Sequence, residues 1–211
     1  MLPKEWLSKE GEGTTVGIID TTVDLTLPQI RNSVKEERAF GRTSTRHGTF
    51  IVSTIHSIAK RASLVVAHGD LDRVEEMLEW MVQFKLDVLN CSWAFFEPKQ
   101  NVMRLLEEIA DKGTIVVCAY SKDFPYPWSN RRFISAGEEI PVKPEHSLQV
   151  NSLLLSTMRG NSVAAALVSG TTALGRAVIP SIDKKTLISR IRPEDIPSRL
   201  YRQSKQRIIE I

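Results

Sequence analysis

Short apolar runs alternate along this chain with segments whose apolar residues recur at helical spacing. The first run, 16–19, is bounded by glycine-rich sequence and by Asp20, which is typical of a buried strand. Similar runs occupy 63–67, 87–92, 114–119 and 132–136, and helical patterns lie between them at 49–59, 71–84 and 100–112. Such alternation produces βαβ units. We therefore predict an α/β fold in three layers, with a mostly parallel central sheet and helices on both faces.

The last third of the chain continues the pattern less clearly. Residues 148–156 predict one or two further strands, and 163–178 predict a helix of small and apolar residues that ends before Pro180. A length of 211 residues fits a single domain, 1–211. The segment 183–211 is basic. It is interpreted as a solvated helix with a packing tail, or alternatively as a docking surface for a partner protein or an acidic substrate.

Composition excludes several classes of function. The 28 basic and 25 acidic residues leave a net charge of only +3, which predicts neither nucleic acid nor a membrane surface as a partner. No stretch approaches the ~20 apolar residues of a membrane span, and the first residues do not resemble a secretory signal. A cytoplasmic chain, or a domain of a longer protein, is expected. Cys91 and Cys118 lie in apolar runs and are predicted to be buried free thiols.

Candidate catalytic residues lie where a parallel sheet places its active site, just beyond the carboxyl ends of strands. Asp20 follows the first predicted strand, His47 precedes Gly48-Thr49 at the start of a helix, and Ser162 follows Gly160-Asn161 at the start of another. Taken singly, each has a simpler structural interpretation, such as a helix cap or a loop histidine. Together they supply the nucleophile, base and orienting carboxylate that acyl transfer requires.

The sequence around these residues resembles the subtilisin-like serine proteases, or subtilases, over nearly the whole chain. Four blocks carry the resemblance: Gly17-Ile18-Ile19-Asp20-Thr21-Thr22-Val23-Asp24, Arg46-His47-Gly48-Thr49, Asp87-Val88-Leu89-Asn90-Cys91-Ser92-Trp93, and Gly160-Asn161-Ser162-Val163-Ala164. The resemblance implies a compact subtilisin-like sandwich. It also implies that Ser162 attacks the scissile carbonyl, that His47 transfers the proton, and that Asp20 orients the imidazole. A peptide substrate would pair along Ser92, Trp93 and Ala94.

The chain departs from the family pattern where the oxyanion of the reaction would be bound. Lys122 stands in place of the family's asparagine, and Ser121 in place of a glycine. Lys122 and Asn161 are therefore both candidate donors to the oxyanion, alongside a backbone N–H at the start of the helix. Ala119, Tyr120 and Ser121 lie where the family forms its main specificity pocket. A Tyr120 ring turned inward would narrow this pocket, whereas a ring turned outward would be a surface aromatic.

Two functions remain open on this pattern. The first is a working serine endopeptidase with a narrow intracellular processing role, acting on a peptide or protein. The second is an inactive pseudoprotease that uses the same fold as a binding or scaffold module. No cofactor is predicted, and no metal site, because 57–63 lacks the acidic residues of a calcium loop and His56, His68 and His146 have no metal-ligand spacing. A dinucleotide site is disfavoured, since no glycine-rich turn follows the first strand.

Overall fold

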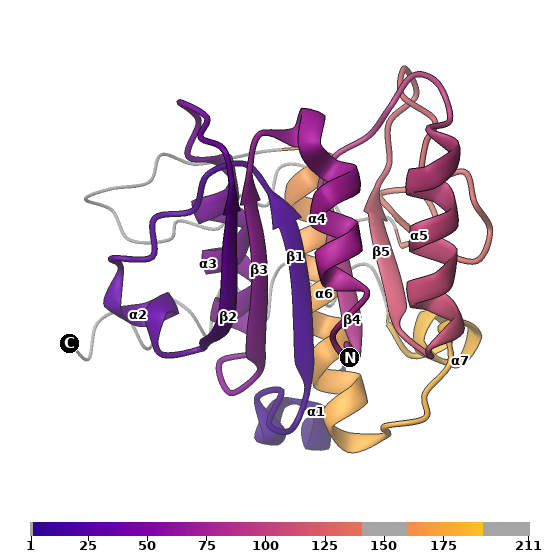
Figure 1. The fold of residues 1–211 in the computed structure, drawn as a ribbon. Helices are drawn as coiled ribbons and strands as arrows, with labels where there is room; N and C mark the ends of the chain where they lie inside the picture. The colour runs from indigo at the N-terminus through magenta and orange to yellow at the C-terminus, as the bar shows by residue number, and fades with distance from the viewer. Residues whose placement is uncertain (1, 141–159, 192–211) are drawn as a thin grey trace.

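A computed structural model describes residues 2–140 and 160–191. Six strands form one sheet in the order β2-β3-β1-β4-β5-β6, and every neighbouring pair within it is parallel. Their bounds are β1 Thr15–Asp20, β2 Val34–Phe40, β3 Ser63–Gly69, β4 Val88–Cys91, β5 Ile115–Ala119 and β6 Ile134–Ala136. The predicted parallel α/β architecture is confirmed (Figure 1). The predicted strand at 148–156 lies outside the described residues.

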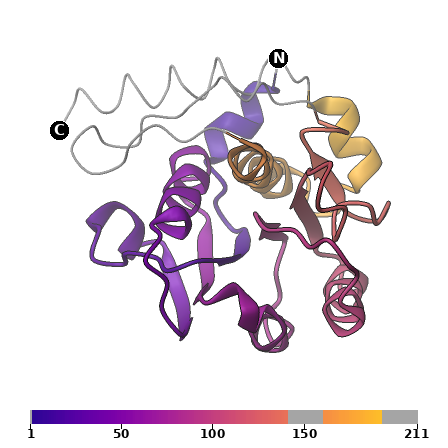
Figure 2. The same ribbon diagram turned by 90° about the horizontal axis from the view of Figure 1, so that it is seen from above.

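Helices cover both faces of the sheet, so the molecule has three layers (Figure 2). One face is covered by α3 (His47–Ile58), α6 (Asn161–Val178) and the short α1 (Lys4–Lys9). The other is covered by α4 (Val74–Met81), which follows a 3-10 turn at Leu71–Arg73, and by α5 (Gln100–Asp111). Two short helices, α2 (Pro28–Arg31) and α7 (Lys184–Arg190), lie outside this pattern.

Two hydrophobic clusters, one on each face of the sheet, form the core. The inner strands β1, β4 and β5 are buried almost along their whole length, which is why their sequences are continuous apolar runs. Helix α6 is buried from Val163 to Gly175. It packs closely against α3, because a Cβ on Gly170 would lie only 2.8 Å from the Cβ of Ile58.

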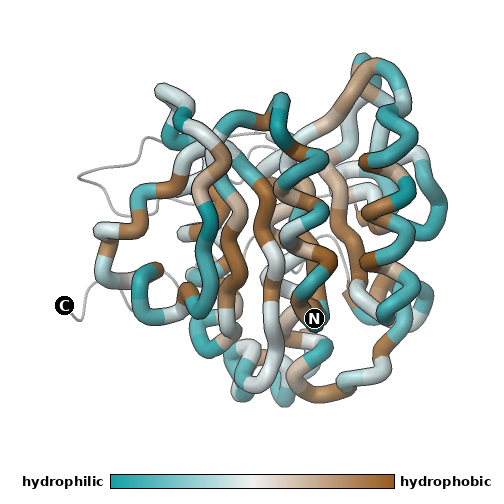
Figure 3. Tube along the Cα trace, in the orientation of Figure 1, coloured by the Kyte–Doolittle hydropathy of each residue, from teal (hydrophilic) through white to brown (hydrophobic). Residues whose placement is uncertain are grey.

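Strand β2 and helix α1 were not predicted from the sequence. Strand β2 lies at the edge of the sheet and has the sequence Val-Lys-Glu-Glu-Arg-Ala-Phe, with only its last residue buried. Its hydrophilic course beside β3 is visible in Figure 3. An exposed edge strand has neither of the apolar patterns that identify a strand. Helix α1 has only six residues, although its Trp6 is fully buried.

The position of β1 determines where a site can form. Strand β3 pairs with one side of β1 and β4 with the other, so the chain crosses over β1 between them. Such a switch in strand order leaves a crevice at the carboxyl ends of the central strands. Asp20 is the last residue of β1, and Ser92 directly follows β4 at the same edge.

Candidate functional site

Asp20 and His47 form a short hydrogen bond at the carboxyl end of β1. The Asp20 carboxylate is buried, and its Oδ1 accepts from His47 Nδ1 at 2.6 Å and from the Thr21 backbone N–H at 2.7 Å. His47 is the first residue of α3, and its side chain is 27% exposed. With Nδ1 donating to the carboxylate, Nε2 is the nitrogen that can accept a proton.

The environment of His47 acts on its pKa in two opposite directions. Burial of the ring lowers the pKa, because it disfavours the charged form. The hydrogen bond to Asp20 and the negative charge of that carboxylate raise it, and together they prevail, so that the pKa of His47 lies above its ordinary 6.5. The pair therefore stabilises the imidazolium that a general base becomes after it takes a proton.

The start of α3 is fastened to the segment that follows Asp20. Gly48 donates its backbone N–H to Thr21 Oγ1 at 2.9 Å, and Asp24 donates its N–H to Thr49 Oγ1 at 2.8 Å. The two segments approach so closely that a Cβ on Gly48 would lie 2.2 Å from the Thr21 carbonyl oxygen. Only glycine fits at this position without displacing the helix that carries His47.

Ser162 occupies the first turn of α6, directly after Asn161 and Gly160, which has φ +126°. Its hydroxyl donates to the Ser92 carbonyl oxygen at 3.0 Å, and the Ser92 hydroxyl donates to the Ser162 carbonyl oxygen at 3.2 Å. Within the described ranges, no hydrogen bond joins Ser162 to His47. Asp20 and Ser92 each come one residue after the paired Ile19 and Cys91. The reciprocal bonds therefore hold Ser162 against the strand that neighbours Asp20.

Buried side chains hold Ser92 in place through a series of hydrogen bonds. Asn90, which is fully buried in β4, donates from Nδ2 to Ser92 Oγ at 2.9 Å. Ser169, fully buried in α6, donates to Asn90 Oδ1 at 3.0 Å. These bonds link β4 to α6 at two points along the helix, so the position of Ser162 depends on both elements.

The two side chains predicted as oxyanion donors have different environments. Lys122 lies in the loop after β5, is exposed, and forms no hydrogen bond or ion pair with the described part of the chain. Asn161 is also exposed, and its Nδ2 donates to the Tyr120 carbonyl oxygen. The first backbone N–H groups of α6 have no acceptor within their own helix, as at any helix start. Both side-chain roles stay predictions.

The segment predicted to bind substrate follows β4. Trp93 is buried and its indole N–H donates to the Ile19 carbonyl at 3.1 Å, which fixes the segment to β1. Phe95 forms an antiparallel bridge with Tyr126, with backbone bonds of 2.6 and 3.2 Å. Between them, the main chain of Ala94 forms no hydrogen bond with the described residues.

The second predicted substrate segment follows β5. Ala119 is the buried last residue of β5, and Ser121 Oγ accepts from the Phe124 backbone N–H at 3.2 Å. The Tyr120 ring packs edge-on against Trp128, with 4.6 Å between ring centroids. The sequence left open whether the Tyr120 ring turns inward or outward. In the structure, its contact with Trp128 sets its orientation.

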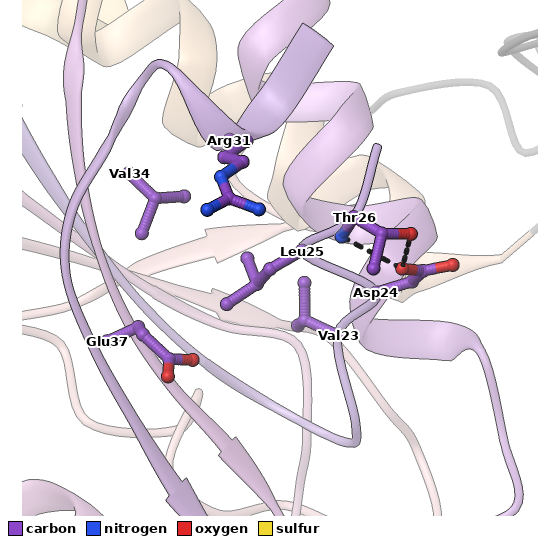
Figure 4. Close-up of a pocket in the computed structure, with 7 residues that line it drawn as sticks. All are labelled: Val23, Asp24, Leu25, Thr26, Arg31, Val34 and Glu37. Atoms are coloured by element: carbon purple, nitrogen blue, oxygen red, sulfur yellow. Dashed lines mark hydrogen bonds between the residues drawn. The ribbon is translucent and has the colours of Figure 1, made fainter. Parts of the chain in front are cut away.

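Two cavities lie on the surface, and the first of them adjoins the segment after β4. A cavity of about 500 Å³ is bounded by residues that follow Ser92 and by Phe124, namely Ala94, Phe95, Phe96, Glu97, Pro98, Lys99 and Phe124. Phe96 and Phe124, which are 71% and 48% exposed, are the exposed large hydrophobic residues of the described chain, and both line it. A second cavity of about 510 Å³ lies between 23–31 and β2 (Figure 4).

Other predictions concern residues away from the site. Cys91 and Cys118 are free and buried, as predicted, and they lie opposite each other in the β4–β5 pair.

Over residues 2–140 and 160–191, no three His, Cys, Asp or Glu side chains cluster as metal ligands would. In the same residues no helix has the length and apolarity to span a membrane. His146 and most of the basic segment, from residue 192 onward, lie outside the described residues.

The fold and the site together define a class: a three-layer α/β protein with a parallel sheet and a polar cluster at the carboxyl ends of its central strands. No protein-family model and no curated protein matches the chain. Among solved structures, it is similar to that of the prenylagaramide maturation protease PagA, with a TM-score of 0.65 and 17% identity over 88% of this chain and 84% of that one. A likeness at this identity establishes the shared fold alone.

These findings correct the assignment to the subtilases. No family model supports it, and the similar solved structure described above is named as a prenylagaramide maturation protease, not as a subtilisin. The assignment rested on short motifs around Asp20, His47 and Ser162, which specify local geometry at strand and helix ends more than they specify a family. We therefore withdraw it and retain the parallel α/β description.

Proposed function

We propose that this protein is a serine endopeptidase in which Ser162 is the nucleophile, His47 the general base and Asp20 the orienting carboxylate. The observation that carries the proposal is the 2.6 Å hydrogen bond between His47 Nδ1 and Asp20 Oδ1, at the sheet edge where a serine begins a long helix. An imidazole held in this tautomer needs only a hydroxyl at its other nitrogen to complete a nucleophilic site.

The proposed reaction proceeds in two halves. Ser162 Oγ attacks the carbonyl carbon of the peptide bond while its proton passes to His47 Nε2, and the carbonyl oxygen becomes an oxyanion. The C–N bond then breaks, His47 gives its proton to the leaving amine, and an acyl ester remains on Ser162. Water, deprotonated by His47, attacks this ester, and the proton returns to Ser162 as the acid product leaves.

The start of α6 supplies electrostatic stabilisation for this oxyanion. At the start of this eighteen-residue helix, the N–H groups of Val163 and Ala164 bond to the Gly160 carbonyl oxygen. Those of Asn161 and Ser162 have no acceptor among the described residues, and the positive end of the helix dipole lies beside them. In serine proteases, removal of one side-chain oxyanion donor lowers turnover by a factor of about 10²–10³. Asn161 would fill that role here only if its amide N–H left the Tyr120 carbonyl oxygen, and Lys122 is the other candidate donor.

Attack also requires the Ser162 hydroxyl to leave the Ser92 carbonyl and turn toward His47. The present bond, at 3.0 Å, is a single neutral hydrogen bond. Its net contribution is about 1 kcal/mol, and a rotation about χ1 moves the hydroxyl between staggered positions. The strand segment Ser92–Ala94, freed from this contact, would then pair with an extended peptide.

The aromatic cavity beside Ala94 supports a substrate with a bulky apolar side chain. Its two exposed phenylalanines, Phe96 and Phe124, would be covered by such a side chain. PagA, whose solved structure is similar to this fold, is named as a maturation protease. We therefore extend the proposal to the processing of a peptide or protein precursor rather than general degradation.

Covalent labelling tests the proposal directly. A fluorophosphonate probe should label the wild-type protein, and mass spectrometry should place the adduct on Ser162. Labelling should disappear in Ser162→Ala and fall strongly in His47→Ala, while Ser129→Ala, at an exposed serine, serves as the matched control. Efficient labelling of Ser162→Ala would contradict the assignment.

One observation favours a second function, that of a binding or scaffold module. The Ser162 hydroxyl is bonded to Ser92 instead of His47, and Asn161 is engaged by the Tyr120 carbonyl. A folded wild-type protein that no fluorophosphonate labels, yet that binds peptides with a bulky apolar residue, would favour this function over the peptidase.

A further inference from the structure

His68 is a buried histidine near the carboxyl ends of the central strands, where Asp20 also lies. It belongs to β3, and its Cα is the register partner of Asp20 in the β1–β3 pair. Its Nδ1 accepts the backbone N–H of Val23 at 3.3 Å, and its Nε2 lies 2.9 Å from Glu37 Oε2 in β2. The residue is 7% exposed, so the ring is largely withdrawn from bulk water.

These two contacts determine the tautomer of His68. A backbone N–H can only donate, so Nδ1 must be unprotonated, and Nε2 then carries the proton that is donated to Glu37. Val23 and Glu37 both line the cavity of about 510 Å³ and lie on opposite sides of it (Figure 4). His68 therefore ties the segment after Asp20 to the edge strand β2.

The segment that His68 holds is the one that fixes the catalytic pair. Val23 is three residues after Asp20, and the intervening Thr21 and Thr22 bond to Gly48 at the start of α3 and to Thr43. Val23 is buried, and its N–H has no other acceptor among the described residues. Loss of the His68 ring would leave this group unpaired and free the segment to shift.

We propose that His68 is a positioning residue of the proposed active site, which holds residues 21–23 so that the Asp20 carboxylate stays aligned with His47. The effect of His68 on the reaction rate rests on the proposed peptidase function, whereas its effect on the alignment of Asp20 with His47 does not. The residue touches neither substrate nor the reacting atoms. Its contribution is made through the backbone of Val23, and the ring is oriented for this by Glu37.

Three variants separate the two contacts. His68→Leu removes both; His68→Asn retains an acceptor near the Nδ1 position and loses the Glu37 bond; Glu37→Gln keeps an acceptor for Nε2 without charge. His56→Leu is the matched control, because His56 also lies largely buried, in α3, but away from the site. There it forms a hydrogen bond of 3.1 Å with Ser33 Oγ. Thermal melts identify variants that are folded.

If the probe labels the wild-type protein at Ser162, His68→Leu should lower both kcat and the rate of labelling by about tenfold to 100-fold, as expected of a misaligned base. The KM should change less than about twofold. His68→Asn should recover most of this loss, and His56→Leu should lose little. A folded His68→Leu variant that reacts at the wild-type rate would overturn the inference. Equal losses in His68→Asn and His68→Leu would also overturn it.

Nuclear magnetic resonance of the His47 ring keeps the inference testable if the wild-type protein is not labelled. Wild type should show a His47 pKa above 6.5, and His68→Leu should lower it, because the Asp20 bond is weakened while burial remains. An unchanged His47 titration in folded His68→Leu would refute the positioning role. Absence of labelling alone would refute only the peptidase proposal.

Discussion

At the scale of single residues, one buried carboxylate sets the hydrogen bonding of the His47 ring in the candidate site. Burial of the His47 ring lowers its pKa, but the hydrogen bond from Nδ1 to Asp20 Oδ1 and the negative charge of that carboxylate together raise the pKa by more. His56 shows the opposite case within the same helix. Burial and the charge of Lys60 lower the pKa of His56. The two histidines of α3 thus titrate on opposite sides of 6.5.

This difference yields a prediction of pH dependence. In Ser162→Ala, the His47 resonance should titrate above pH 6.5 and that of His56 below it. Asp20→Asn should lower the pKa of His47, since burial then acts alone. In the active protein, kcat/KM should fall as pH falls through the His47 pKa, because a protonated base cannot accept the serine proton.

The sign of the linked stability follows from the same shift. A folded-state pKa raised above the unfolded value stabilises the fold fully below about pH 6.5. This contribution is lost as pH rises through the higher folded pKa. Urea melts of wild type and Asp20→Asn should therefore differ more at pH 5.5 than at pH 8.5, and the opposite trend would contradict the assigned shift.

Lys122 provides a prediction about the oxyanion. Its side chain is exposed and forms no bond with the described residues, so nothing in its present position is lost on truncation. We expect Lys122→Ala to change kcat less than about threefold, whereas loss of a true donor would lower it about 10²–10³-fold. A loss in that larger range, measured with a peptide ester, would instead assign the oxyanion to Lys122.

The residues of the site could be predicted from the sequence better than their contacts. Asp20, Ser92 and Ser162 were found because they follow strands or begin a helix, and such positions converge at one edge of a parallel sheet. The Ser162–Ser92 bond was not anticipated, because the direction of one hydroxyl depends on a rotamer and not on spacing. His68 directly follows the strand predicted at 63–67, so the same argument could have found it.

At the scale of elements, the site depends on how tightly α3 and α6 are held against the sheet. The apolar periodicity predicted both helices to within two residues at either end. What it could not predict are the polar bonds that fix their depth, such as Asn90 to Ser92 and Ser169 to Asn90. Long-range pairs of this kind leave no periodic pattern in a single sequence.

Removal of Asn90 should therefore be costly. Asn90→Ala leaves the buried Ser169 hydroxyl without its acceptor and removes the donor to Ser92 Oγ, which keeps its own bond to the Ser162 carbonyl oxygen. A buried polar group left unpaired costs about 1–3 kcal/mol. On this basis, urea melts should show the free energy of unfolding of Asn90→Ala reduced by about 3 kcal/mol. Ser169→Ala removes only one donor and should reduce it by about 1 kcal/mol. Equal, small effects of both variants would show that these hydrogen bonds do not stabilise the β4–α6 contact.

Gly48 tests the attachment of α3 separately. An alanine Cβ would lie 2.2 Å from the Thr21 carbonyl oxygen, so the helix start must move away from β1. Gly48→Ala should reduce labelling of Ser162 by about 100-fold, because a displacement near ~1 Å has an effect of that size. Circular dichroism should show the helical content retained, and undiminished labelling would contradict the close approach.

At the scale of the whole molecule, the charged edge strand β2 protects the sheet. Its exposed Lys35, Glu36 and Arg38 lie on an edge with which no further strand of the described residues pairs, and an apolar strand there would pair with another chain. The double substitution Glu36→Val and Arg38→Val should promote association, seen as larger species in light scattering. The control is a double substitution of the same kind on α5, Arg104→Val with Glu108→Val. In light scattering this variant should show the same particle size as the wild-type protein.

The helix that carries Ser162 also has a consequence for the order of synthesis. Helix α6 packs against α1, α3 and four of the strands, yet it is translated after all of them. A ribosome-bound chain that has not released residue 178 exposes the sheet face which α6 later covers, and it lacks the complete helix that positions the proposed nucleophile. Any hydrolytic capacity is thus withheld from the nascent polypeptide until its core closes.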